Sequence, residues 1–202
     1  MVEERLALWI YEQSLAKQEH SDYEKTRIVY GWTVLFYNLF KILLILLVSA
    51  LLYSLKETLI CYIPFCLLRV SGFGYHAKSN IICNLSGVLL FTVVPCIVSK
   101  ISQLEVMFKS GFSFLFFGVS GVIIILIFAP SFTENSFTED IARVHLLKFI
   151  CLVTFIGLFV ISRVSSAQIG FLMSYGMGIA LLFLLPNYTI KGERKWKRKV
   201  RL

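Results

Sequence analysis

Charged residues and proline are both scarce in this chain of 202 residues. Asp, Glu, Lys and Arg together make up 16% of the sequence, against about 25% in soluble domains, and only four prolines are present. Apolar residues make up 57%, with 18 phenylalanines, and the mean hydropathy is +0.78. So much apolar surface excludes an intrinsically disordered chain and argues against a soluble globule. We therefore predict that a lipid bilayer surrounds the protein.

Several familiar motifs are also missing. The sequence has no HExxH, no GxSxG and no Walker loop, and the charged residues 1–30 lack the apolar core of a signal peptide. Its five cysteines are odd in number and irregularly spaced, which argues against a disulfide framework. Cys61, Cys66, His76 and Cys83 could be assembled as metal ligands, but their spacing matches no zinc pattern. We expect no metal and no cofactor.

The positive charge is concentrated at one end of the chain. Residues 191–202 carry seven basic residues and one acid, and the rest of the chain has a net charge of only +2. A basic tail can bind nucleic acid, but beside a hydrophobic segment it is more typical of the cytoplasmic anchor of a membrane protein. We expect no nucleic-acid partner.

The hydropathy pattern predicts an all-α integral membrane protein with one domain over residues 1–202. Residues 1–30 form an amphipathic helix, which lies either on the membrane surface or against the rest of the protein. Residues 32–186 are embedded in the membrane, and residues 187–202 form the basic tail. About six apolar runs cross or partly enter the bilayer: Trp32–Leu55, Leu59–Val70 (broken at Pro64), Ile81–Ser99, Gly111–Pro130, Leu146–Ser162 and Ser166–Pro186.

Six crossings place both termini of this multi-pass protein on the cytoplasmic side of the cell membrane. Arg69, Lys78 and Arg143 then lie on the cytoplasmic side, as the positive-inside rule expects, whereas Lys100, Lys109 and Arg163 do not. If the second run does not cross, five spans remain and the N-terminus lies outside. The last run carries a small-residue stripe, which serves packing either within one chain or in a dimer: Ser166, Gly170, Ser174 and Gly178.

The only polar cluster inside the apolar body is residues 69–83. His76 and Cys83 are the minimum for an activated thiolate, in which the imidazole takes the thiol proton and the sulfur attacks a carbonyl. Arg69 adds a positive charge that favours the thiolate or holds a substrate carboxylate. The alternative is that His76 only anchors the chain at the membrane surface and that Cys83 only fills space at the start of an apolar run.

The spacing of Arg69, His76 and Cys83 along the chain decides which backbone conformation would let them react together. His76 comes seven residues after Arg69 and Cys83 seven after His76, so on one helix they share a face but each lies about 10.5 Å from the next. Proton transfer needs about 3 Å. Gly72 and Gly74 permit bends, so we predict a helix–turn–helix hairpin that folds His76 back onto Cys83. A straight helix over residues 69–90 excludes the pair within one chain.

At these residues the sequence resembles the accessory gene regulator B (AgrB) family, the membrane peptidases of Gram-positive quorum sensing. The pattern reads Arg69, Gly74-Tyr-His76-Ala, Cys83. Similar segments occur at Asp22–Gly31 with Asn38 and Lys41, and at Phe128-Ala-Pro130 with Asn135. Many family members carry Gly-Gly where this chain has Phe73-Gly74.

The resemblance implies a cysteine endopeptidase with Cys83 as nucleophile, His76 as general base, and Arg69 and Gly74 in support. Its substrate would be a small AgrD-like precursor peptide, whose acidic tail is attracted by Lys78, by Arg143 or by the basic C-terminus. Loss of that tail through a thioester on Cys83 would yield a cyclic thiolactone or lactone autoinducing peptide. The resemblance also implies a homodimer. The alternatives from the residues alone are a small peptide transporter or a non-catalytic signalling scaffold.

Overall fold

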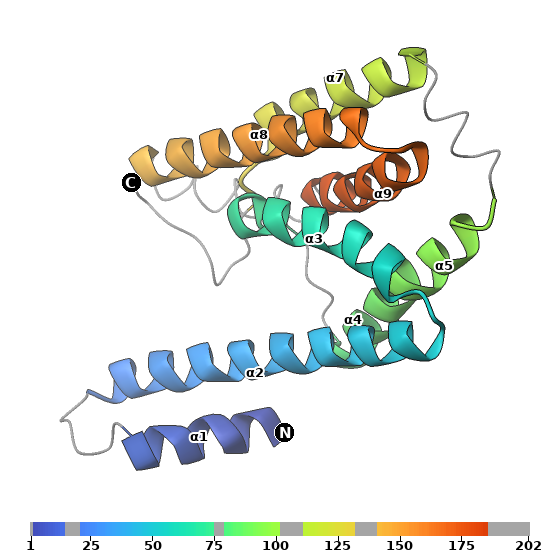
Figure 1. Cartoon of the computed structure of the whole chain (residues 1–202). Helices are drawn as coiled ribbons and strands as arrows, with labels where there is room; N and C mark the ends of the chain where they lie inside the picture. Colours follow the sequence, from blue (N-terminus) through green and yellow to red (C-terminus); the bar gives the residue numbers. More distant parts are fainter. Residues whose placement is uncertain (1, 15–20, 75–78, 102–110, 132–140, 186–202) are drawn as a thin grey trace. The chain divides into compact units, whose positions relative to one another are not determined.

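The part of the chain that the computed structural model describes, residues 2–14, 21–74, 79–101, 111–131 and 141–185, consists of helices joined by short connections (Figure 1). These residues contain no strand, which confirms the all-α class. The helices are α1 (Val2–Ser14), α2 (Asp22–Leu51), α3 (Leu55–Gly72), α4 (Asn80–Val88), the π-helix η1 (Leu89–Val93), α5 (Val94–Val98), α7 (Gly111–Phe128), α8 (Ile141–Val164) and α9 (Ala167–Leu184).

The N-terminal unit, Met1–Val48, holds α1 and most of α2. The single helix expected over residues 1–30 is wrong: α1 ends at Ser14 and α2 begins at Asp22. The reason is a capping box, in which the Glu24 N–H donates to Ser21 Oγ at 3.3 Å and the Ser21 N–H donates to Glu24 Oε2 at 3.0 Å. This reciprocal pair satisfies two N–H groups at the start of a new helix.

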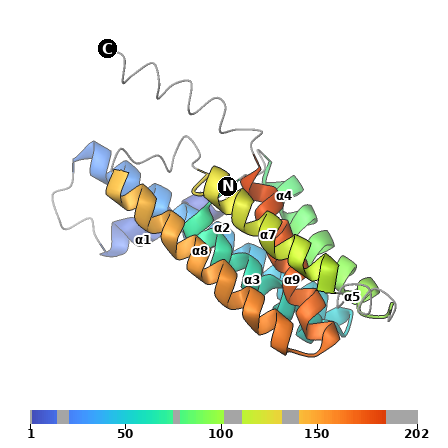
Figure 2. The same ribbon diagram turned by 90° about the horizontal axis from the view of Figure 1, so that it is seen from above.

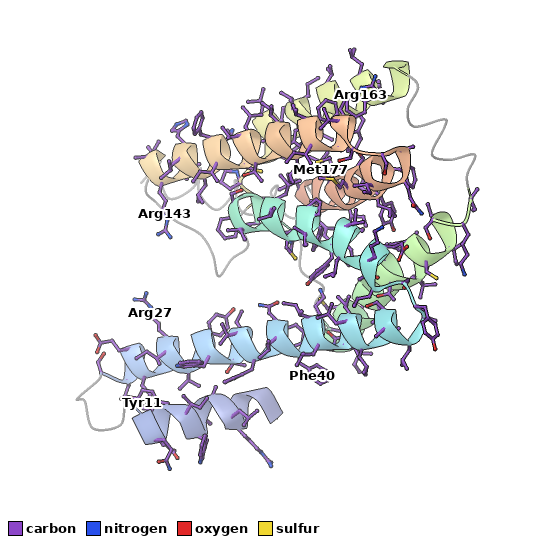
Figure 3. All side chains as sticks on the ribbon, viewed as in Figure 1. Tyr11, Arg27, Phe40, Arg143, Arg163 and Met177 are labelled. Carbon is purple, nitrogen blue, oxygen red and sulfur yellow. The ribbon has the colours of Figure 1, made fainter. Side chains whose placement is uncertain are left out.

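Helix α1 packs against α2 through one edge. Ala7 and Tyr11 are buried, and the ammonium of Lys25 in α2 lies 5.5 Å from the centre of the Tyr11 ring. Tyr11 is labelled in Figure 3. Trp9, on another side of α1, is 58% exposed. Within the N-terminal unit, α1 therefore contacts α2 through the side of the helix that carries Ala7 and Tyr11.

The second unit, Ser49–Leu202, contains the remaining helices. Among the described residues of the whole chain, four helical stretches are long and apolar enough to cross a membrane: Glu24–Leu51, Ile81–Val98, Ile141–Val164 and Ala167–Leu184. All six apolar runs of the sequence are helical. The run expected to break at Pro64 is instead one continuous helix, α3, with Pro64 buried inside it. Neighbouring helices make such a proline tolerable in a membrane protein.

Helix α9 lies at the centre of the second unit, beside α7 and α8 (Figures 1 and 2). Half of α9 is buried, against 17% of α8 and 22% of the stretch Ile81–Val98. Met177 in its middle is fully buried (Figure 3). A Cβ at Gly176 would collide with the backbone carbonyl of Cys61, so the absence of a side chain lets α9 touch the backbone of α3.

The small-residue stripe of α9 packs within the protomer. A Cβ at Gly170 would collide with the carbonyl of Ser162 in α8, and the Ser174 hydroxyl donates to Ser162 Oγ at 3.5 Å. A Cβ at Gly178 would rest against Phe117 of α7 at 3.6 Å. Small residues therefore bring α8 and α7 close to α9, as they do in lipid generally.

Candidate functional site

The two halves of the predicted site lie on separate helices. Helix α3 ends at Gly72 and α4 begins at Asn80, so residues 69–90 are not one straight helix. The arrangement that would exclude a pair between His76 and Cys83 is therefore not the one adopted. His76 and Lys78 lie outside the described residues, and their roles stay predictions.

Cys83 is buried in the first turn of α4. Its N–H donates to the carbonyl of Ser79 at 3.0 Å, the first helical bond there. The N–H groups and the dipole at a helix N-terminus favour a negative charge nearby. The five cysteines, all among the described residues, form no disulfide.

Arg69, in the last turn of α3, interacts electrostatically with this thiol. Its guanidinium lies 5.7 Å from the centre of the Phe65 ring and 5.5 Å from that of Phe183 in α9. It also interacts electrostatically with Cys83 and Cys66. The two rings hold the planar guanidinium between helices by cation–π contact. Arg69 therefore supplies a fixed positive charge next to Cys83.

Gly74 occupies a place that only glycine suits. Its φ is +110°, in the region that L side chains rarely adopt. A Cβ there would lie 2.6 Å from the Phe183 carbonyl oxygen and 2.7 Å from Nη1 of Arg69. Gly74 thus lets the chain pass between α9 and the Arg69 guanidinium on its way to residues 75–78.

Phe73, directly before Gly74, also has a positive φ of 57°. A non-glycine residue in this conformation is strained by about 1–2 kcal/mol. This is the position at which the chain departs from the Gly-Gly that the family resemblance implies. The backbone geometry explains why glycine suits that position.

Ser131, in the connection after α7, is hydrogen-bonded to the end of α3. Its N–H donates to the Gly72 carbonyl at 2.9 Å, and its own carbonyl accepts the Gly74 N–H at 3.0 Å. These bonds pair Phe73 with Ser131 as a parallel bridge. Ser131 follows Phe128-Ala-Pro130, so two segments recognised separately in the sequence meet in space. The sequence analysis did not predict this contact. The sign of it in the sequence is that Ser131 directly follows the Phe-Ala-Pro segment.

Arg143, the described residue proposed to attract an acidic tail, is exposed in the first turn of α8 (Figure 3). Arg163 lies in the last turn, at the far end of the same helix. Within the described residues, no three His, Cys, Asp or Glu side chains are grouped to hold a metal.

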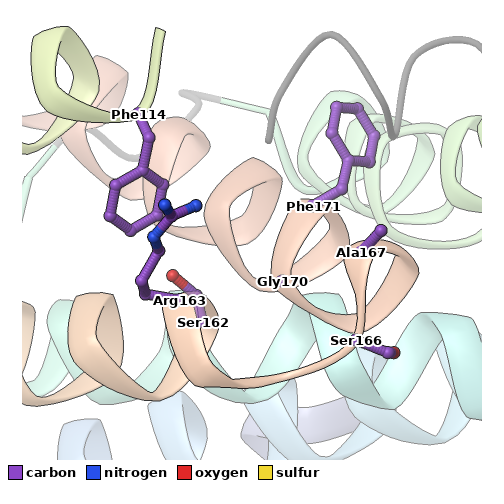
Figure 4. A pocket seen from close by; sticks show the side chains of 7 residues that line it. All are labelled: Phe114, Ser162, Arg163, Ser166, Ala167, Gly170 and Phe171. Atoms are coloured by element: carbon purple, nitrogen blue, oxygen red, sulfur yellow. The ribbon is translucent and has the colours of Figure 1, made fainter. Parts of the chain in front are cut away.

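A small pocket lies far from this site. It is lined by Phe114, Ser162, Arg163, Ser166, Ala167, Gly170 and Phe171 (Figure 4). Gly170 and Phe183 are separated by about 20 Å along α9, at 1.5 Å per residue. The pocket is therefore at the opposite end of α9 from Arg69 and takes no part in the chemistry of Cys83.

Comparison with known proteins assigns the chain to a family. The family model described as Accessory gene regulator B matches residues 4–186. Accessory gene regulator protein B of Staphylococcus aureus (strain JH9) is 25% identical over 184 residues, covering 91% of this chain and 93% of that protein. Protein FsrB of Enterococcus faecalis (strain ATCC 47077 / OG1RF) is 27% identical over 184 residues, covering 88% of this chain and 72% of that protein.

A protein from Staphylococcus epidermidis with the same name, Accessory gene regulator protein B, is 25% identical over 185 residues and matches 91% of this chain. No solved structure matches. Because the family model covers nearly the whole chain, from before α2 to the end of α9, the protein belongs to the accessory gene regulator B family.

Proposed function

We propose that this protein is a membrane cysteine endopeptidase of quorum sensing that removes the C-terminal tail of a small AgrD-like precursor. The observation that carries the proposal is the position of Cys83, a buried thiol in the first turn of a helix and next to the Arg69 guanidinium. The helix N-terminus and the positive charge of Arg69 both favour a negative charge at the sulfur, whereas burial alone would disfavour it. A cysteine that merely fills space in a bilayer needs neither.

The reaction has two steps. His76 takes the thiol proton, the Cys83 sulfur attacks the carbonyl of the scissile peptide bond, and a thioester forms as that bond breaks. The proton passes from His76 to the nitrogen of the departing tail. A thiol or hydroxyl of the bound peptide then attacks the thioester and regenerates the Cys83 thiol. The product is a thiolactone or lactone, and because the thioester keeps the carbonyl activated, no ATP is required.

The surroundings of Cys83 suit an intermediate that water would destroy. Cys83 is buried, and the neighbouring Phe65 and Phe183 rings present apolar surface around Arg69. Excluding water from such a site limits hydrolysis of the thioester. The predicted cytoplasmic basic groups, including Lys78 and Arg143, would attract an acidic tail, and the family resemblance also implies a homodimer.

Tail release from a synthetic precursor tests the proposal. The wild-type protein, Cys83→Ala and Cys96→Ala are reconstituted in liposomes and given an AgrD-like peptide with an acidic tail. Cys96 is the matched control because it is a half-buried thiol on the same run of helix, in α5. We expect tail release to vanish in Cys83→Ala and to persist in Cys96→Ala. Equal cleavage by Cys83→Ala would overturn the proposal.

A further inference from the structure

The C-terminal end of α7 lacks a backbone hydrogen bond for a reason that the sequence makes plain. In an α-helix the carbonyl of each residue accepts from the N–H four residues later. The Ala129 N–H closes the last such bond, on Ile125 at 3.0 Å. The carbonyl of Leu126 would need the N–H of residue 130, but that residue is proline and has none.

Lys148 supplies the missing donor from the neighbouring helix. Its ammonium donates to the Leu126 carbonyl oxygen at 2.9 Å. Lys148 is half-buried in the second turn of α8, a stretch apolar enough to cross the membrane. A lysine is costly at such a position unless it has a partner, and a positive charge at the C-terminal end of a helix is favourable. Lys148 and the carbonyl left open by Pro130 satisfy each other.

This bond lies next to the residues that hold the site. The end of α7 continues directly into Ser131, whose backbone bonds Gly72 and Gly74. One turn after Lys148, Cys151 of α8 lies against Gly72, with its sulfur 3.3 Å from where a Cβ would be. Helix α8 therefore holds α7 through Lys148 and the end of α3 through Cys151.

We propose that Lys148 is a positioning residue for the reaction at Cys83. By holding the end of α7 it keeps Ser131 bonded to Gly74, and so fixes where the segment that leads to His76 leaves α3. This proposal rests on the proposed function, which supplies the reaction at Cys83. The bond between Gly74 and Ser131 can be followed without any reaction.

Hydrogen exchange measures that bond directly. In Lys148→Met, which keeps the length of the side chain but cannot donate, we expect the Gly74 N–H to exchange about tenfold faster, the loss expected for one weakened hydrogen bond. Lys148→Arg retains a donor and should restore slow exchange. Amides in the middle of α9 should exchange at the wild-type rate in both. An unchanged Gly74 rate in Lys148→Met would overturn the proposal, as would an equal acceleration throughout α8 and α9, which marks general destabilisation.

Steady-state tail release gives a second readout. Misplacing the reacting groups should lower kcat by roughly ten- to a hundredfold and leave KM within about twofold in Lys148→Met, with recovery in Lys148→Arg. Lys100→Met is the control, because Lys100 is exposed beyond the end of α5. Wild-type kcat in Lys148→Met would contradict the proposal. If the wild-type protein releases no tail, the proposed function fails, and the exchange experiment still decides whether Lys148 holds Gly74.

Discussion

The N–H of Gly74 donates to the carbonyl of Ser131 across 3.0 Å, and the Ser131 N–H returns a bond to Gly72 at 2.9 Å. These two bonds join the connection after α3 to the connection after α7. Gly74 is the last described residue before the segment that carries His76. The point at which the chain leaves α3 is therefore held by the connection after α7 as well as by α3 itself.

Gly74→Ala should abolish tail release and lower stability by about 2 kcal/mol, because alanine is strained at a positive φ. Its Cβ would also press on the Phe183 carbonyl and on Arg69. Denaturant titration in detergent and the tail-release assay measure the two effects. Gly157→Ala is the matched control, since no atom lies within 4 Å of its added Cβ. Wild-type activity in Gly74→Ala would show that the close approach at Gly74 is dispensable.

Phe73→Gly should be more stable than Phe73→Ala by about 1 kcal/mol, the reverse of the order inside a helix. Both variants lose the aromatic ring, so their difference isolates the backbone at φ 57°. Their free energies of unfolding in detergent give the comparison. If Phe73→Ala is the more stable of the two, the strain assigned to Phe73 is absent.

Gly176→Ala should destabilise the protein by about 2 kcal/mol, because its Cβ meets the Cys61 backbone and α9 must move away from α3. Gly178→Ala is the control on the same helix. Its Cβ makes only ordinary contact with Phe117 at 3.6 Å. Thermal unfolding of both variants in detergent tests this, and equal midpoints would contradict the close packing of α9 on α3.

Arg69→Met should slow alkylation of Cys83 by iodoacetamide about tenfold at neutral pH, because a nearby charge contributes about 1 kcal/mol or more to the thiolate. Arg69→Lys should recover the rate only in part, since an ammonium lacks the planar contact with Phe65 and Phe183. Mass spectrometry of the peptide containing Cys83 gives the rate. Identical rates in wild type and Arg69→Met would remove the electrostatic role of Arg69.

The helices were largely predictable because hydropathy reports burial in lipid directly. The run expected over Ile81–Ser99 is helical over Asn80–Val98, and that over Ser166–Pro186 over Ala167–Leu184. The break at Ser14 was missed because the capping box at Ser21 and Glu24 lies within a continuous helical pattern. Pro64 led to the opposite error. A break was predicted there, but the helix continues through it because neighbouring helices make the proline tolerable.

The site was predictable only in part. That one helix does not run from Arg69 to Cys83 followed from their spacing and from Gly72 and Gly74. The bonds from Ser131 and Lys148 did not, because their acceptors are backbone carbonyls of residues distant in sequence, and a backbone carbonyl carries no residue identity. The absence of an N–H on Pro130 was the one local sign that the end of α7 needs a partner.

The central claim is that Cys83 forms a thioester with the precursor peptide. The direct measurement is the intact mass of the protein after a brief reaction in liposomes with an AgrD-like peptide, alongside Cys83→Ala and His76→Ala. We predict a mass increase equal to the tail-less peptide, localised to Cys83, removed by hydroxylamine, absent in Cys83→Ala and strongly reduced in His76→Ala. Tail release without any adduct on Cys83, or an adduct that survives in Cys83→Ala, would contradict the account.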